Sequence, residues 1–69
     1  MKVNVNGEER RIELDQKNPL LSTILNYMGY KQNTIIVELN SSIINSKKWE
    51  EVKIKDGDNL EIVSIVGGG

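Results

Sequence analysis

Sixty-nine residues leave room for one domain with a small hydrophobic core. Nine Lys and Arg and ten Asp and Glu are interspersed and give a net charge of −1, so no basic stripe suggests nucleic acid as a partner. The absence of Cys and His excludes disulfides and thiol chemistry and removes the commonest general base and metal ligand. A binding or carrier module is therefore favoured over an enzyme, with no metal and no intrinsic catalytic residue expected.

The longest aliphatic run, Ile35 to Val37, is far too short to span a bilayer, and no charged segment followed by an apolar one opens the chain. We therefore expect a cytoplasmic protein with no membrane partner, monomeric when free.

The first segment predicts a β-hairpin. Residues 2–6 alternate polar and apolar, and Asn6-Gly7 favours the positive φ angles of a type I′ turn. The second strand of the hairpin is predicted at about residues 9–14, and its apolar residues should face the same side as those of the first strand. One face of the hairpin should therefore be apolar and need a cover, through Val3, Val5, Ile12 and Leu14.

A helix is predicted to supply the cover. Asn18 is suited to cap its N-terminus, Pro19 to occupy the first helical position, and Gly29 to follow its last turn. Apolar residues recur at i, i+3, i+4 and i+7, at Leu21, Ile24, Leu25 and Met28.

Two further strands are predicted from alternation. In residues 34–40, Ile35, Val37 and Leu39 should face the helix, which leaves Ile36 on the outer face. In residues 60–66, two side chains should point inward, Leu60 and Ile62, and three outward, Glu61, Val63 and Ile65.

Two short features connect these strands. Ser46 is a possible N-cap for one turn that brings Trp49 to the edge of the core. Asp56-Gly57-Asp58 predicts a tight turn, and its two carboxylates lack the further oxygen ligands that calcium or magnesium requires.

The order of hairpin, helix, strand, short turn and strand predicts an α+β fold, with a mixed β-sheet and one main helix packed on one face. Pairing the first and last strands in parallel at the centre of the sheet would make it a ubiquitin-like β-grasp. Residues 1–66 should form this domain, and residues 67–69 a flexible C-terminal glycine tail.

Gly67, Gly68 and Gly69 have no side chain to pack, so they should form a thin, mobile tail. Such a tail can thread a narrow channel in another protein and place the α-carboxylate of Gly69 beside a nucleotide. Transfer of that carboxylate to the α-phosphate of ATP would create an acyl-adenylate that a sulfur nucleophile can attack. A frayed terminus or an expression linker is the alternative interpretation.

Outward Ile36, Val63 and Ile65 would form an apolar patch that leads into the tail. This patch is a candidate docking surface. Isolated exposed aliphatic residues are also common on proteins, so the ordinary interpretation remains beside the functional one.

The chain resembles, essentially end to end, the thiamine-biosynthesis sulfur carrier proteins of the ubiquitin-like β-grasp superfamily. The most specific stretch runs from Asp56-Gly57-Asp58 through residues 60–63 to the ending Val66-Gly67-Gly68-Gly69. Further matches are the Val-Asn-Gly hairpin, Ile24-Leu25 with Gly29, residues 37–40 and Trp49. A departure is Asn45-Ser46, where many members have Pro-Arg or a similar pair.

The resemblance implies a cycle carried out on the tail by other proteins. A partner related to ubiquitin-activating enzymes would adenylate Gly69 with ATP, and the carboxylate would become a thiocarboxylate. Sulfur would originate from cysteine through a desulfurase persulfide and pass to thiazole synthase. Gly68 would belong to the diglycine that both partners recognise, and no cofactor would be bound.

Three alternatives remain open at this stage. Small subunits of molybdopterin synthase share the fold and the terminal diglycine. A non-covalent β-grasp interaction module would make the glycines incidental, and conjugation in the manner of ubiquitin would end in an amide bond to lysine.

Overall fold

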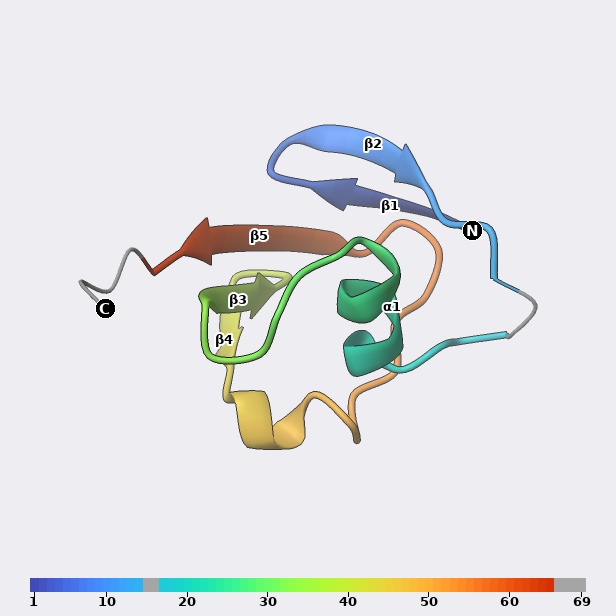
Figure 1. The fold of residues 1–69 in the computed structure, drawn as a ribbon. Coiled ribbons are helices and arrows are strands. Elements are labelled where there is room, and N and C mark those ends of the chain that lie inside the picture. Colours follow the sequence, from blue (N-terminus) through green and yellow to red (C-terminus); the bar gives the residue numbers. More distant parts are fainter. Residues whose placement is uncertain (15–16, 66–69) are drawn as a thin grey trace.

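A computed structural model describes residues 1–14 and 17–65 of the chain (Figure 1). Its elements in chain order are β1 (Lys2–Val5), β2 (Glu8–Arg11), α1 (Leu21–Tyr27), β3 (Ile35–Leu39), β4 (Ser42–Ile44), the 3-10 turn η1 (Ser46–Lys48) and β5 (Asn59–Ser64). None of the helices in these ranges has the length and apolar character needed to cross a membrane. The predicted boundary between residues 66 and 67 lies outside the described residues.

The five strands form one mixed sheet in the order β2-β1-β5-β3-β4. β5 lies at its centre, parallel to β1 and antiparallel to β3 (Figure 1). The predicted central parallel pairing of the first and last strands is therefore confirmed, and with one helix on one face the fold is a ubiquitin-like β-grasp. Strand β4 was not predicted; it is three residues long and pairs along the edge of β3.

The hairpin turns as predicted, because Asn6 and Gly7 adopt φ angles of 53° and 82°. β2 ends at Arg11, three residues before the predicted end, because its partner β1 begins at Lys2, which pairs with Arg11. The predicted phase of the strand is still correct. Ile12 is buried and continues the pairing through a 2.8 Å bond from its N–H to the carbonyl of Met1.

The core lies between the sheet and α1. Its buried members come from every predicted apolar face: Val3, Val5, Ile12, Leu21, Ile24, Leu25, Ile35, Val37, Trp49, Ile54, Leu60 and Ile62. Leu14, Met28 and Leu39, also predicted to face inward, are partly buried against this cluster. The inward phase predicted for each strand and for the helix is confirmed.

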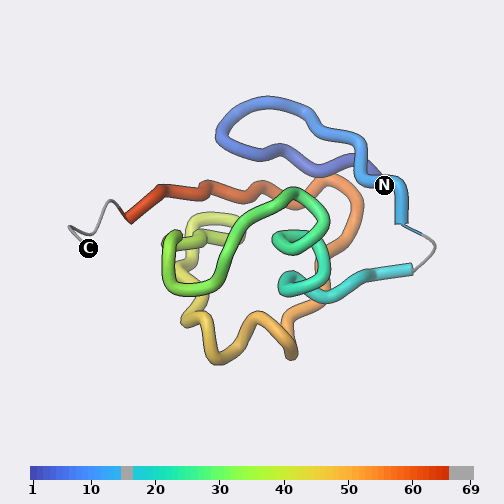
Figure 2. The backbone as a smooth tube through the Cα atoms, in the orientation of Figure 1, coloured from blue at the N-terminus to red at the C-terminus, as the bar shows by residue number. Residues whose placement is uncertain are grey.

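The predicted start of the helix is wrong. Asn18 has a positive φ of 53° and does not cap α1, whose N-cap is Leu20 without a side-chain hydrogen bond. Leu20 is extended, with φ −72° and ψ 151°, because this segment pairs with the chain near Lys53 (Figure 2). Ile54 N–H donates to Pro19 O at 2.8 Å. Tertiary hydrogen bonding thus delays the helix by two residues.

The predicted end of the helix is correct. Met28 is the C-cap and Gly29 follows it with φ +87°, in the left-handed region that favours glycine. The N–H groups of Gly29 and Tyr30 donate to the carbonyls of Asn26 and Leu25 at 3.0 and 2.9 Å. This pair of bonds is the Schellman motif, which satisfies two of the last carbonyls of the helix.

The short turn η1 is capped by Asn45, not by Ser46 as predicted. The Asn45 side chain accepts a bond from Lys47 N–H at 2.9 Å. Because β4 ends at Ile44, the N-cap of η1 comes at Asn45, one residue earlier than the sequence pattern suggests. Trp49 follows η1 and closes the edge of the core as predicted, 5% exposed, with its indole N–H donating to Ile44 O at 3.1 Å.

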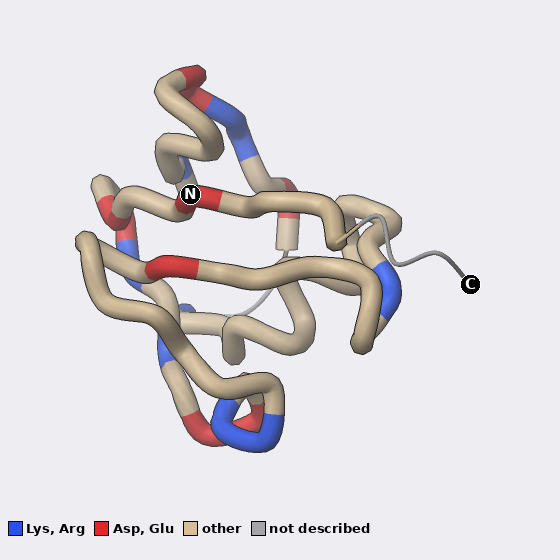
Figure 3. The backbone as a smooth tube through the Cα atoms, turned by 90° about the vertical axis from the view of Figure 1, so that its left-hand side faces the viewer, with Lys and Arg blue, Asp and Glu red and all other residues tan. Residues whose placement is uncertain are grey.

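Charged residues gather in a few segments of the described chain, and none lies between residues 18 and 30 (Figure 3). Both signs occur together in β2, Glu8–Arg11, and again around η1. The two ion pairs within residues 1–14 and 17–65 join Lys2 to Glu9 and Lys48 to Glu51, and all four side chains are more than half exposed. Pairs of this kind contribute little to stability.

Candidate functional site

β5 is the strand that leads toward the C-terminal glycines. It is held on both sides near its start, where Asn4 N–H donates to Asp58 O at 2.9 Å and Asn40 N–H donates to Asn59 O at 2.8 Å. Near its end, Ile65 N–H still donates to Thr34 O at 2.8 Å. The structure therefore holds the chain in the sheet as far as Ile65.

Beyond Leu60, β1 no longer runs beside β5, and the side chain of Asn6 takes its place. Asn6 Oδ1 accepts from Ile62 N–H at 2.7 Å, and Asn6 Nδ2 donates to Ile62 O at 3.2 Å. The amide therefore makes both bonds that a neighbouring strand residue would make. This residue was predicted only as part of a turn, because a contact between residues so far apart leaves no local sequence signal.

The predicted docking residues lie together on the outer face of the sheet, opposite α1. Ile36 and Val63 are directly paired across β3 and β5, and Ile65 follows two positions after Val63. Their exposed fractions are 45%, 58% and 46%. The structure therefore brings the three residues into one apolar patch beside the end of β5.

Ile43 adds a fourth aliphatic side chain to this face and was missed in the sequence. It lies on β4 opposite Glu38 and is 71% exposed. Because directly opposed residues on antiparallel strands share a face, Ile43 lies on the same side as Ile36. Predicting a strand at residues 42–44 would have placed Ile43 on this face. We call Ile36, Ile43, Val63 and Ile65 the outer apolar patch.

The turn predicted at residues 56–58 is confirmed, with Gly57 at φ +87°. Asp58 is 5% exposed and its carboxylate accepts from Asn40 Nδ2 at 3.1 Å and from Lys55 N–H at 2.9 Å. Asp56 accepts from Lys2 N–H at 2.6 Å. Within the described ranges, no group of three or more His, Cys, Asp or Glu side chains could hold a metal ion.

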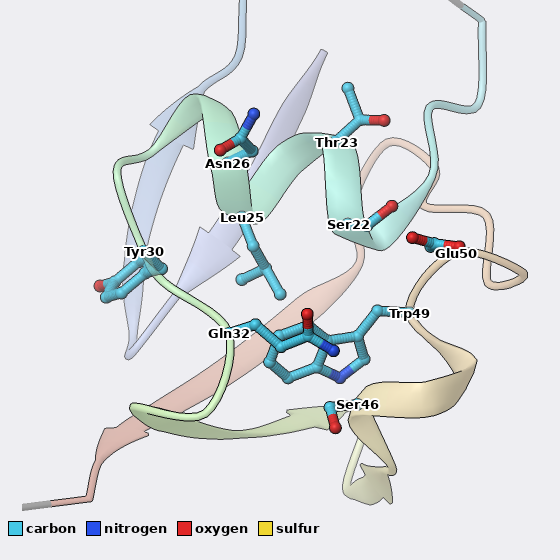
Figure 4. A pocket seen from close by; sticks show the side chains of 9 residues that line it. All are labelled: Ser22, Thr23, Leu25, Asn26, Tyr30, Gln32, Ser46, Trp49 and Glu50. Carbon is cyan, nitrogen blue, oxygen red and sulfur yellow. The ribbon is translucent and has the colours of Figure 1, made fainter.

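A groove of about 340 Å³ lies on the other side of the molecule, between α1, residues 30–32 and η1 (Figure 4). Its lining combines the aromatic and apolar side chains of Leu25, Tyr30 and Trp49 with a polar rim: Ser22, Thr23, Asn26, Gln32, Ser46 and Glu50. The rim holds hydroxyl, amide and carboxylate groups. None of these nine residues is a His or a Cys.

The predicted reactive residue Gly69 and the predicted recognition residues Gly67 and Gly68 lie outside the described residues. The part of the predicted last strand at Val66 does so too. What the structure supplies for this site is therefore the strand that precedes the glycines and the face beside it.

Comparison with known proteins places nearly the whole chain in one family. The family model described as ThiS family matches residues 3–69. The sulfur carrier protein ThiS of Bacillus subtilis is 31% identical over 67 residues, covering 97% of this chain and 98% of that protein. A protein of Trieres chinensis named uncharacterized protein ycf40 is 43% identical over 49 residues, covering 71% of this chain and 67% of its own length.

A thiazole synthase of Paramagnetospirillum magneticum is 35% identical to this chain over 69 residues. The match covers all of this chain but only 20% of that protein. The chain thus spans about a fifth of the length of this much longer relative.

A solved structure agrees with the fold. The crystal structure of the thiamine biosynthesis protein ThiS from Geobacter metallireducens superposes with a TM-score of 0.83 and 26% sequence identity, over 100% of both chains. The matched residues include the glycine run and the strand that leads to it. The chain therefore belongs to the ThiS family, the sulfur carrier proteins of thiamine biosynthesis.

Proposed function

We propose that this protein carries sulfur as a thiocarboxylate on Gly69, formed by partner enzymes and delivered to thiazole synthase. The observation that carries the proposal is the path of β5. This strand is bonded to β1, to Asn6 and to β3 and then leads to three glycines. A firmly held strand followed by residues without side chains suits a tail that is inserted into another protein's active site.

The chemistry proceeds in two steps on the α-carboxylate. A carboxylate oxygen attacks the α-phosphorus of ATP, the bond between the α- and β-phosphates breaks, and pyrophosphate leaves. A sulfur nucleophile then attacks the acyl carbon of the adenylate and AMP leaves. When that nucleophile is a persulfide derived from cysteine by a desulfurase, a second thiol reduces the resulting acyl disulfide and leaves the thiocarboxylate on Gly69.

In this proposal the protein is a co-substrate and not an enzyme. Its composition supports that role, because the chain has no Cys and no His to act as nucleophile or base. ATP is consumed by an adenylyltransferase related to ubiquitin-activating enzymes and is not a resident cofactor. We assign the cycle to the cytoplasm, where ATP and the desulfurase act.

Thiazole synthase is the proposed acceptor of the sulfur. Supporting this assignment, thiazole synthases of Paramagnetospirillum magneticum and Magnetococcus marinus match the full length of this chain over 20% of their own, at 35% and 28% identity. A segment similar to this chain therefore occurs in one polypeptide with that enzyme. Joining two partners in this way raises their effective concentration and favours proteins that act together.

The outer apolar patch is the proposed docking surface for both partners. Its four aliphatic side chains are 45–71% exposed, and three of them, Ile36, Val63 and Ile65, lie beside the end of β5. A partner that covers this patch would hold the tail at a constant distance from its own active site. Each partner must also accept Gly67 and Gly68 in a narrow channel.

Intact-mass measurement tests the proposal. The protein is incubated with ATP, a cysteine desulfurase, cysteine and the adenylyltransferase of the same organism. The expected mass increase corresponds to replacement of one oxygen by one sulfur, and it should be absent without ATP. Unchanged mass, under conditions where the Bacillus subtilis carrier reacts with its own enzymes, would refute the proposal.

Two variants locate the reactive group. Deletion of Gly69 and extension of the chain by several residues should each abolish the mass change, while the thermal unfolding curve stays the same. If the extended protein retained full activity with thiazole synthase, the free carboxylate would not be required. A non-covalent interaction module would then be the better description.

A further inference from the structure

Two carboxylates lie directly opposite each other on the outer face of the sheet. Glu38 on β3 is paired with Glu61 on β5. Side chains opposed in this way have Cβ atoms about 4.5–5.5 Å apart, and like charges at this distance destabilise the sheet. Within residues 1–14 and 17–65, neither carboxylate forms an ion pair.

The two carboxylates border the outer apolar patch. Ile43 lies opposite Glu38 on β4, while Ile36 and Val63 form the next outward pair on β3 and β5. A protein surface that contacts both Ile43 and Val63 therefore also passes over Glu38, and Glu61 lies at its border, two positions before Val63 on β5. Glu38 is already half-buried in the free protein.

Covering an unpaired carboxylate is costly, because its hydration is lost and nothing replaces it. The cost is offset only when the covering surface supplies a positive charge and hydrogen-bond donors. A guanidinium group fits best, since its planar set of donors can bond two carboxylates at once.

We propose that the outer face of the sheet docks a protein surface that presents an Arg or Lys side chain between Glu38 and Glu61, with apolar side chains around it that contact Ile43, Ile36 and Val63. This inference rests on the proposed function, and the partner that it concerns is the adenylyltransferase. The two carboxylates then act as a specificity element: they weaken the free sheet slightly and reject surfaces without a matching positive charge.

The test measures binding and folding on the same variants. Affinity for the adenylyltransferase of the same organism is measured without ATP, by calorimetry, for the wild type and for Glu38→Gln/Glu61→Gln. We expect the affinity of the double variant to fall at least about tenfold. The wild-type affinity should also decrease with added salt, and that of the variant should respond much less.

The same double variant should unfold at a higher urea concentration than the wild type, because the repulsion between the carboxylates is removed. Weaker binding together with a more stable fold is the signature of a functional charge pair. Loss of a purely structural contact would lower stability instead.

Glu13→Gln/Glu50→Gln is the matched control. It makes the same change in net charge at two exposed carboxylates, one following the β1–β2 hairpin and the other on the helix side beside the groove. Its affinity should stay within about twofold of the wild type, because long-range effects of exposed charges are screened. An equal loss of affinity in the control would show that binding responds only to net charge, and it would overturn the inference.

The inference and the proposed function fail in different ways. If Val63→Ser weakens binding and the glutamine double variant binds as the wild type does, the proposed cationic contact is wrong although docking on this face stands. If Gly69 acquires no sulfur, the proposed function fails whatever the binding data show. Unchanged stability in the double variant would refute the repulsion on which the inference depends.

Discussion

Both faces of the central strands carry aliphatic side chains, but those on one face are buried and those on the other are exposed. On the inner face, Val37, Leu60 and Ile62 are 0–7% exposed beneath α1. On the outer face, Ile36, Val63 and Ile65, which alternate with them on β3 and at the end of β5, are 45–58% exposed. Hydrophobicity therefore does not distinguish a core residue from a candidate docking residue here; the phase of the strand does.

The largest difference between the faces should appear in stability. Leu60→Ala removes a side chain that is 1% exposed and leaves a cavity, which should lower the free energy of unfolding by about 2–5 kcal/mol. Ile65→Ala, on the outer face near the same strand, should change it by less than about 0.5 kcal/mol. Urea unfolding of both variants measures the contrast, and equal losses would show that the outer face also contributes to the core.

The turn before β5 holds a buried carboxylate, Asp58. Asp58→Ala leaves the amide of Asn40 and the N–H of Lys55 without their acceptor, which should cost about 1–3 kcal/mol of unfolding free energy. Asp56→Ala removes an exposed acceptor in the same turn and should cost less than about 1 kcal/mol. A larger loss for Asp56 would mean that its contact with Lys2 is the one that holds the turn.

The second half of β5 is held in the sheet by the side chain of Asn6. Asn6→Gly keeps the positive φ of the turn but removes both bonds to Ile62, at an expected cost of about 1–2 kcal/mol. Hydrogen exchange at the Ile62 amide should accelerate. Asn33→Gly is the control, because Asn33 has φ 72° and is exposed; if it accelerated exchange at Ile62 equally, the effect would not come from the Asn6 side chain.

The smallest effect on stability should accompany the largest effect on docking. Val63→Ser should change the free energy of unfolding by less than about 0.5 kcal/mol, because Val63 is 58% exposed. It should lower kcat/KM for adenylation by about tenfold or more if Val63 is an anchor of the docking surface. Tyr27→Ser, at an exposed apolar residue on α1, should leave adenylation unchanged; equal losses in both variants would contradict the assignment of docking to the outer face.

Much of the fold could be predicted from local pattern. Alternation assigned the inward and outward residues of β3 and β5 correctly, since the period of a strand is two and one face must be buried. Gly29 and Gly57 were correctly placed at turns because both need positive φ angles. The predicted docking residues followed from the same alternation, and the structure adds that Ile36 and Val63 are directly opposed.

Contacts between distant segments decided the rest. Asn18 and Pro19 resemble a helix start, yet Pro19 and Leu20 pair with residues 53–54 and the helix begins at Leu21. The same holds for the bonds from Asn6 to Ile62 and for the pairing of Glu38 with Glu61, which join residues far apart in the chain. The pairing of Ile43 with Glu38 depends on the register of two neighbouring strands. The sequence alone determined the order of the main elements along the chain and which of their residues face inward, because both depend on residue type and local period. It also predicted chemistry at the carboxylate of Gly69, which lies outside the described residues. Only the tertiary structure determined which exposed side chains share one face, because register is a property of paired strands.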